Sequence, residues 1–369
     1  MLDFTSEDVQ LAVADRYACR LFIGQRRAAA AAPVVEALRQ SLGLASDMTT
    51  YVPWFVARTV AWRNSPVIAV LEENDRPVAA VLFYGRQQFG IPTGVIKGGN
   101  RSGDGLVVAA EGHRIAALQA AIAAVLALPW VHMVLVSMRG EATPEAMASA
   151  TPSFDCVWHS REVSTHLSLA GGFEGFLSRL RPRSRRNYRY FRRRAENELG
   201  LAFLPNLRPD DAMQAVAELH GIAMHPVPRA RAHRLEAAIR DTPGYFAMGV
   251  RDAAGRWLSY LSGWRQPEGT FVEWQLNRHD MPAVSLSTVM RTYLLEHEAA
   301  SGVMQVVFVG GTSAALGHYC APDRCFDLLA TPAGVQGRMI KRFMARLHPR
   351  GQVALLTRGA ASGSAPKGT

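Results

Sequence analysis

The 369-residue chain is poor in cysteine and has no pair of cysteines with metal-site spacing. Its cysteines form no CxxC motif; they are Cys19, Cys156, Cys320 and Cys325. Cysteine-based zinc sites and dithiol redox motifs need such closely spaced thiols. We therefore expect reduced thiols in a cytosolic protein, and no metal.

The chain also has no long uninterrupted apolar run. The most apolar stretch, residues 115–138, is broken by Gln119, Pro129 and His132. This pattern predicts a buried helix followed by a buried strand, and no transmembrane segment. The first ten residues, MLDFTSEDVQ, are acidic and have no apolar centre, so no signal peptide is expected and the predicted location is cytoplasmic.

Acidic residues are missing from one strongly basic stretch. Nine arginines and no acid fall between Arg179 and Arg194, in a chain with 41 basic and 31 acidic residues and a net charge of +10. The rest of the chain is nearly neutral, so the charge predicts a local anionic partner and not general coating of DNA. A helix from about Ser184 is expected to place four arginines on one broad face; they are Arg185, Arg189, Arg192 and Arg193. Arginine suits bidentate binding of phosphate or carboxylate, although a purely solvated face stays open.

A repeat divides the chain. Residues 67–87 and 246–266 both read as two strands around a polar turn, and each pair is followed by a third strand, an apolar-periodic helix and a buried strand. The offset of 179 residues aligns Arg86 with Arg265. A helical region precedes the strands in both copies. The sequence therefore predicts an α/β protein with mainly antiparallel strands in each half.

This pattern resembles two tandem GNAT folds, the acetyltransferase type. The stretch FEGFLSRLRPRSRRNYRYFRRRAENELGLAF resembles the entry helix of the bacterial cellulose-biosynthesis-associated acetyltransferases, and the two-copy layout resembles the transferases that use aminoacyl-tRNA to build peptidoglycan cross-bridges. The resemblance covers about residues 160–347. It implies an N-terminal degenerate GNAT-like domain (1–155), a C-terminal acyltransferase domain (156–357) and a disordered tail (358–369).

The resemblance implies acyl-CoA, such as acetyl-CoA, as the donor. In a GNAT fold the donor lies where two central strands splay apart, and its pyrophosphate meets backbone N–H groups at the next helix start. Here that junction contains Ser285, Leu286, Ser287 and Thr288, with Ser285 or Ser287 as the N-cap. The usual glycine-rich loop is missing. The first copy has the more glycine-rich junction, GGNRSGDG at 98–105, which is either a phosphate cradle or a flexible loop.

Three side chains are the candidate catalytic residues. Strand alternation predicts that Glu273 points the same way as Phe271, Gln275 and Asn277, and by resemblance it takes the position of a general base. Tyr319 could protonate a leaving group, and His318 could carry protons.

Two further groups are candidate binding residues. Gly310 and Gly311 permit close approach of a ligand to the backbone. His225 and Arg229 could grip an anionic acceptor.

These residues predict an N- or O-acyltransferase acting on an amine or hydroxyl of a small-molecule or saccharide acceptor. Two alternatives stay open: an aminoacyl-tRNA-dependent transferase with tRNA held by the arginine helix, and a catalytically degenerate adaptor in envelope polysaccharide biosynthesis.

Overall fold

Five strands and a helix recur in the same order in each half of the chain, and the last four strands and the helix are those of the sequence repeat. The computed structural model describes residues 9–13, 17–44, 48–100, 105–139, 154–223, 226–281, 284–309, 314–317, 319–334, 339 and 353–356. The elements of the first half are β1 (Val9–Val13), β2 (Tyr17–Ile23), α1 (Gln25–Ala30), α2 (Ala32–Ser41), α3 (Val52–Ala61), β3 (Ser65–Glu73), β4 (Arg76–Gln88), β5 (Ile91–Gly98), β6 (Val107–Ala109), η1 (Glu111–His113), α4 (Arg114–Leu126) and β7 (Met133–Arg139).

The second half repeats the pattern after an inserted helical pair. Its elements are β8 (Phe154–Ser168), α6 (Gly172–Arg179), α7 (Pro182–Leu199), β9 (Ala202–Leu204), α8 (Pro209–Leu219), α9 (Arg229–Arg240), β10 (Tyr245–Arg251), β11 (Trp257–Gln266), β12 (Gly269–Asn277), α10 (Leu286–Ala300), β13 (Gln305–Phe308), α11 (Ala314–Gly317), β14 (Ala321–Pro332) and β15 (Val353–Leu356). The series β2, β3, β4, β5, α4, β7 thus corresponds to β9, β10, β11, β12, α10, β13. The predicted arginine-rich helix is α7.

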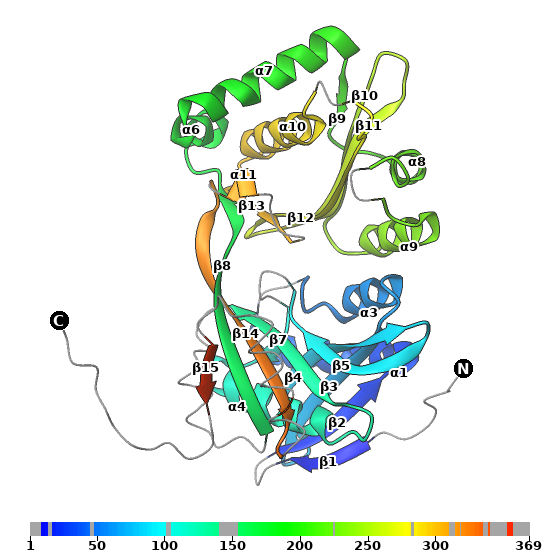
Figure 1. Cartoon of the computed structure of the whole chain (residues 1–369), viewed down its shortest axis with the longest axis vertical. Helices are drawn as coiled ribbons and strands as arrows, with labels where there is room; N and C mark the ends of the chain where they lie inside the picture. The colour runs from blue at the N-terminus through cyan, green and yellow to red at the C-terminus, as the bar shows by residue number, and fades with distance from the viewer. Residues whose placement is uncertain are drawn as a thin grey trace, which may run out of the picture.

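The two halves share one sheet because they exchange a strand. The order is β1-β2-β3-β4-β5-β7-β14-β8-β13-β12-β11-β10-β9. β8 follows β7 in the chain but pairs with β13, while β14 follows β13 but pairs with β7. β8 and β14 also pair with each other, from Phe154 opposite Pro332 to His166 opposite Ala321 (Figure 1). The division at residue 155 stays a prediction; it falls at the start of β8, one of the two exchanged strands.

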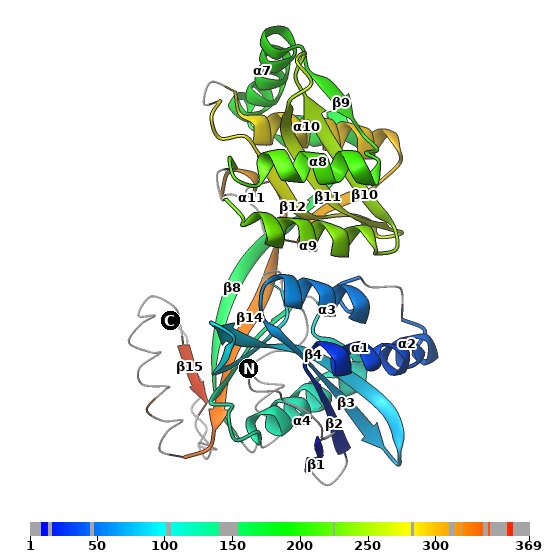
Figure 2. The same ribbon diagram turned by 90° about the vertical axis from the view of Figure 1, so that its right-hand side faces the viewer.

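Helices cover both faces of the sheet. In the first half, α1, α2 and α3 pack on one face and α4 on the other. In the second half, α8 and α9 lie on one face, while α10 lies on the other beneath α6 and α7. The helices α3 and α9 face each other where the halves meet (Figures 1 and 2). In the described part of the chain, no helix is long and apolar enough to cross a membrane.

β14 completes the core of the opposite half. Its residues Phe326, Leu328 and Ala330 are buried in the same cluster as Val134 and Val136 of β7 and the apolar face of α4. Leu328 is fully buried. A residue late in the chain therefore stabilises the first half.

Replacing Leu328 by alanine tests this placement. Leu328→Ala removes buried methyl groups and leaves a cavity, so the free energy of unfolding is expected to fall by about 2–5 kcal/mol. The measurement is urea denaturation followed by tryptophan fluorescence. The matched control is Leu44→Ala, at a site that is 39% exposed, which should change it by about 0.5 kcal/mol or less. If the free energy of unfolding fell by the same small amount in Leu328→Ala and Leu44→Ala, that result would contradict the packing of β14 in the first half.

Candidate active site

A β-bulge in strand β12 sets the direction of Glu273. Ser262 pairs with Trp274, but the next residue, Gly263, pairs with Val272, so Glu273 has no partner position on β11. A bulge bends the strand and redirects a side chain. Only glycine fits at position 263, because a Cβ atom there would overlap the carbonyl oxygen of Phe271.

The bulge corrects the predicted alternation of this strand. Phe271 and Trp274, three positions apart, both pack on the side of α9, while Val272 packs on the side of α10. The prediction that Phe271, Glu273, Gln275 and Asn277 simply alternate with their neighbours is therefore wrong. An inserted residue shifts the two-residue period by one position.

Glu273 lies in a cleft of about 520 Å³ between the two halves, which we call the central cleft. Its walls come from α3, β4 and β5 of the first half, and from α9, β11 and β12 of the second. The side chains that matter for its chemistry are Trp54, Arg58, Trp62, Tyr84, Arg86, Lys97, Arg231, Trp264 and Glu273. A cleft of this size and mixed lining suits a small molecule.

A buried ion pair joins the halves inside the central cleft. Arg58 Nε donates to Glu273 Oε1 at 2.7 Å, and the Glu273 side chain is only 5% exposed. Its second oxygen, Oε2, is buried without a hydrogen-bond partner among the described residues. Burial raises the pKa of Glu273, and the Arg58 cation opposes that rise. One oxygen of this carboxylate is therefore held by Arg58, and the other is buried without a hydrogen-bond partner among the described residues.

The remaining charges that line the central cleft are positive. Burial lowers the pKa of Lys97, and repulsion from Arg86 lowers it further. The guanidinium of Arg231 lies 5.1 Å from the centre of the Trp62 ring, and its Nε has no partner in the described part of the chain. The Tyr84 phenol has a raised pKa because it is buried. The cleft thus combines one carboxylate with a cationic rim.

Tyr319 lies on the other face of the second-half sheet. Its phenol forms a short hydrogen bond with the Ser184 hydroxyl, and its ring packs with the cluster between α7 and α10. Glu273 and Tyr319 are therefore not brought together. Between them β12 and β13 pair only from Thr270 to Val272, after which β12 continues to Asn277 paired with β11 but not with β13.

The start of α10 partly matches the predicted donor site. Ser285 is the N-cap, but its hydroxyl bonds the Thr288 hydroxyl at 2.8 Å and caps no backbone N–H. The N–H groups of Leu286 and Thr288 bond the carbonyls of Val284 and Ser285. Ser287 lies between them. The role of these residues toward a donor stays a prediction.

Several predicted residues lie outside the described residues: His225, Gly310, Gly311 and His318. Arg229 is the exposed first residue of α9, and Arg231 of the same basic stretch is the residue of that helix that lines the central cleft.

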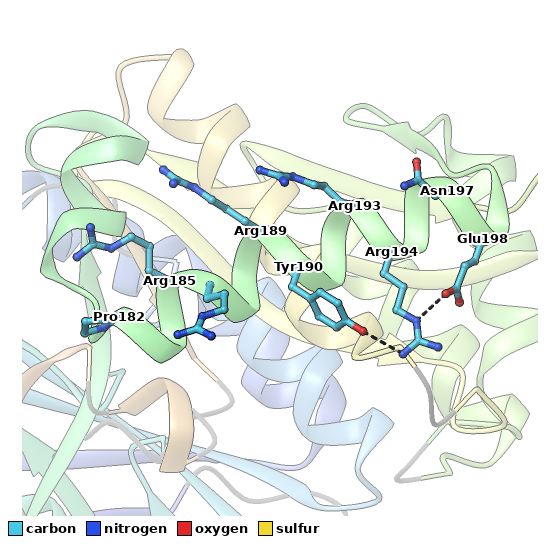
Figure 3. Close-up of a pocket in the computed structure, with 9 residues that line it drawn as sticks. Pro182, Arg185, Arg189, Tyr190, Arg193, Arg194, Asn197 and Glu198 are labelled. Atoms are coloured by element: carbon cyan, nitrogen blue, oxygen red, sulfur yellow. Dashed lines mark hydrogen bonds and ion pairs between the residues drawn. The ribbon is translucent and has the colours of Figure 1, made fainter.

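The arginines of α7 divide between two sides of the helix. A shallow hollow of about 920 Å³ on the outer side is lined by Pro182, Arg185, Arg186, Arg189, Tyr190, Arg193, Arg194, Asn197 and Glu198 (Figure 3). Within it Arg189 pairs with Glu174 at 3.0 Å, and Arg194 pairs with Glu198 at 2.8 Å.

Arg192 does not share this outer face, so that part of the prediction is wrong. It donates to Glu196 at 2.8 Å and to Glu296 of α10 at 2.5 Å, and it lies 4.6 Å from the centre of the Tyr293 ring. Arg192 therefore attaches α7 to α10. Glu296 is distant in sequence, so the periodicity of α7 alone could not reveal this partner.

Sequence reasoning also missed the first-half residues of the central cleft. The one available signal was the repeat, which aligns Arg86 with Arg265. In the structure Arg265 pairs with the fully buried Glu298 at 2.8 Å, whereas Arg86 has no carboxylate partner among the described residues. The two aligned arginines thus differ in role, and Arg86 is the one that lines the cleft.

Comparison with known proteins gives matches among solved structures only. No protein-family model and no curated protein matches the chain. FemX aligns with 79% of this chain and 95% of its own at 8% identity and a TM-score of 0.53. L-PGS from Bacillus licheniformis aligns with 85% and 96% at 10% identity and a TM-score of 0.51. A tandem GNAT protein from the clavulanic acid biosynthesis pathway aligns with 86% and 99% at 13% identity and a TM-score of 0.49.

The predicted fold class is confirmed. The chain consists of two tandem GNAT-like halves in a mixed, mainly antiparallel sheet flanked by helices. Structural similarity at such low sequence identity shows the fold alone. The chemistry depends on the residues of the central cleft. Across the described part of the chain, no cluster of His, Cys, Asp and Glu is arranged to hold a metal ion.

The pKa of Glu273 can be tested without knowing the substrate. Infrared difference spectra between wild type and Glu273→Gln, recorded against pH, isolate the carboxyl band of Glu273. Its pKa is expected above the usual range for glutamate, and Arg58→Gln should raise it further because the opposing cation is removed. Arg194→Gln, on the outer side of α7, is the control and should leave it unchanged. An equal or lower pKa in Arg58→Gln would show that the ion pair does not act on Glu273.

Proposed function

We propose that the chain is an acyltransferase that moves an acyl group from acyl-CoA to an amine or hydroxyl of a small-molecule or saccharide acceptor bound in the central cleft. The observation that carries this proposal is the unpartnered, buried oxygen Oε2 of Glu273. A buried carboxylate with a raised pKa in the wall of a cleft is suited to general-base catalysis.

The proposed step uses Glu273 as the base. The acceptor nitrogen or oxygen attacks the acyl carbon of the donor while its proton passes to Glu273 Oε2. The new bond to the acyl carbon forms, and the carbon–sulfur bond of the thioester breaks. Arg58 holds the other oxygen at 2.7 Å and fixes the orientation of the carboxylate.

The separation of Glu273 and Tyr319 fits two different roles. The departing thiolate must receive a proton, and a donor lying where β12 and β13 separate would place its sulfur toward the face of α10. Tyr319 lies on that face and shares a hydrogen bond with Ser184. We assign Tyr319 to protonation of the leaving group, while the roles of His318, Gly310 and Gly311 stay predictions.

The outer side of α7 favours aminoacyl-tRNA as the second candidate donor. The hollow there gathers five arginines and the half-exposed Tyr190. Arginine and aromatic side chains together suit contact with RNA phosphates and bases. The tRNA-dependent transferase therefore remains the second candidate, while membership of the cellulose-associated family and a place in polysaccharide biosynthesis rest on sequence resemblance.

One assay separates these candidates. Purified protein is offered acetyl-CoA or a mixture of aminoacyl-tRNAs, together with a panel of amine and hydroxyl acceptors, and transfer is followed by mass spectrometry. Glu273→Gln should reduce transfer by about 10²–10⁴-fold because the proton acceptor is lost. The matched control is Glu268→Gln, in the exposed turn before β12, which should retain full activity.

The donor from which transfer occurs distinguishes the candidate functions. Transfer from acetyl-CoA supports the first proposal, and transfer from aminoacyl-tRNA alone supports the second. Full activity in Glu273→Gln would remove Glu273 from the mechanism. No transfer from either donor would favour the non-enzymatic adaptor.

A further inference from the structure

The rim of the central cleft carries cations that the described residues do not neutralise. Arg86 lies at the exposed mouth on β4, Lys97 is half-buried on β5, and Arg231 reaches in from α9. None of these three has a carboxylate within ion-pair distance in the described part of the chain. Arg189 on α7, by contrast, has an acidic partner on a neighbouring helix.

We propose that this rim is a binding site for a phosphate or carboxylate group of the acceptor. That the anionic ligand is the acyl acceptor rests on the function proposed above, whereas the anion site itself does not. Grouping like charges around a cleft costs free energy unless an anion compensates them. A ligand that supplies the anion would therefore bind at the rim with its reactive amine or hydroxyl directed inward, toward Glu273.

The local electrostatics support this assignment. The pKa of Lys97 is lowered mainly by burial and further by repulsion from Arg86, while attraction to the Asp327 carboxylate is the smallest cause and raises it. Lys97 and Arg86 thus repel each other across the site. Tyr84 stands directly opposite Lys97 in the pairing of β4 and β5, and its phenol can donate to an anion held between the two cations. The only carboxylate among the described lining residues, Glu273, is already paired with Arg58.

Two glycines let the backbone near Lys97 pass close to neighbouring backbone at the edge of the cleft. Gly99 and Gly105 line the same cleft with positive φ angles of 73° and 75°, and a Cβ atom on Gly99 would overlap the Ser137 carbonyl oxygen. Glycine is therefore required there for the chain to turn away after β5. Of the glycine-rich junction of the first copy, Gly99, Asn100 and Gly105 thus line the cleft that holds the proposed anion site.

The walls restrict the ligand to a small molecule. Trp54, Trp62 and Trp264 line the cleft, and the volume of about 520 Å³ is that of a small-molecule site. The ligand class is therefore a small metabolite or sugar derivative with an anionic group at one end and an amine or hydroxyl at the other. A nucleic-acid chain would instead need an open surface.

Calorimetry with simple anions tests this proposal without any acyl donor. Inorganic phosphate, inorganic pyrophosphate and acetate are titrated separately into the full chain at constant ionic strength. Saturable binding is expected for at least one probe, and the preferred probe tells phosphate from carboxylate. Arg86→Gln and Lys97→Met should each weaken it about tenfold, the usual effect of removing one charged hydrogen bond. Arg194→Gln, outside the cleft, should bind as wild type does.

Two further variants distinguish loss of anion binding from loss of folding. Lys97→Arg retains the charge and should bind nearly as well as wild type, which separates lost recognition from lost folding. Glu273→Gln should bind the probe at least as tightly, because it removes a negative charge from the cleft. Binding without acyl transfer in any assay would leave the anion site standing and overturn only the proposed function. No binding of any probe, or binding unaffected by the cleft variants, would overturn the anion site.

Discussion

The structure depends on one constraint, the exchange of β8 and β14 between its halves. Each strand follows one repeat in sequence and completes the sheet of the other, so backbone hydrogen bonds run through the whole molecule. Two GNAT-like units joined only by a linker would be free to move apart. Here the sheet fixes their relative position and brings α3 against α9. The central cleft exists because these two surfaces are held face to face.

The residues that line the central cleft come from both halves of the chain. The second half supplies Glu273, directed by a bulge that Gly263 permits. The first half supplies Arg58, which holds one carboxylate oxygen, and the cations of the rim. Removing one partner of a buried ion pair leaves an uncompensated charge. The first half therefore supplies part of the lining of the central cleft, and its description as a degenerate copy stays a prediction.

Much of the fold was predictable from the sequence, because hydrophobic periodicity and spacing report local elements well. The repeat, the helix α7 and the strand carrying Glu273 all followed from such patterns. The pairing partner of a strand is not specified by its local sequence. An apolar run such as β14 therefore does not show which half of the sheet it completes. Arg58 was missed because it lies 215 residues from Glu273 and reads as an ordinary polar position on α3. Arg192 was assigned to the wrong side because its partner Glu296 is on another helix.

The central claim, that the two halves form one site through Arg58 and Glu273, is tested most directly by a double-mutant cycle. The free energies of unfolding of wild type, Arg58→Met, Glu273→Gln and the double variant are measured by urea denaturation. A direct contact predicts a coupling energy of about 1–3 kcal/mol, with the double variant less destabilised than the sum of the two single variants. Additive effects, with a coupling energy near zero, would contradict the joint site.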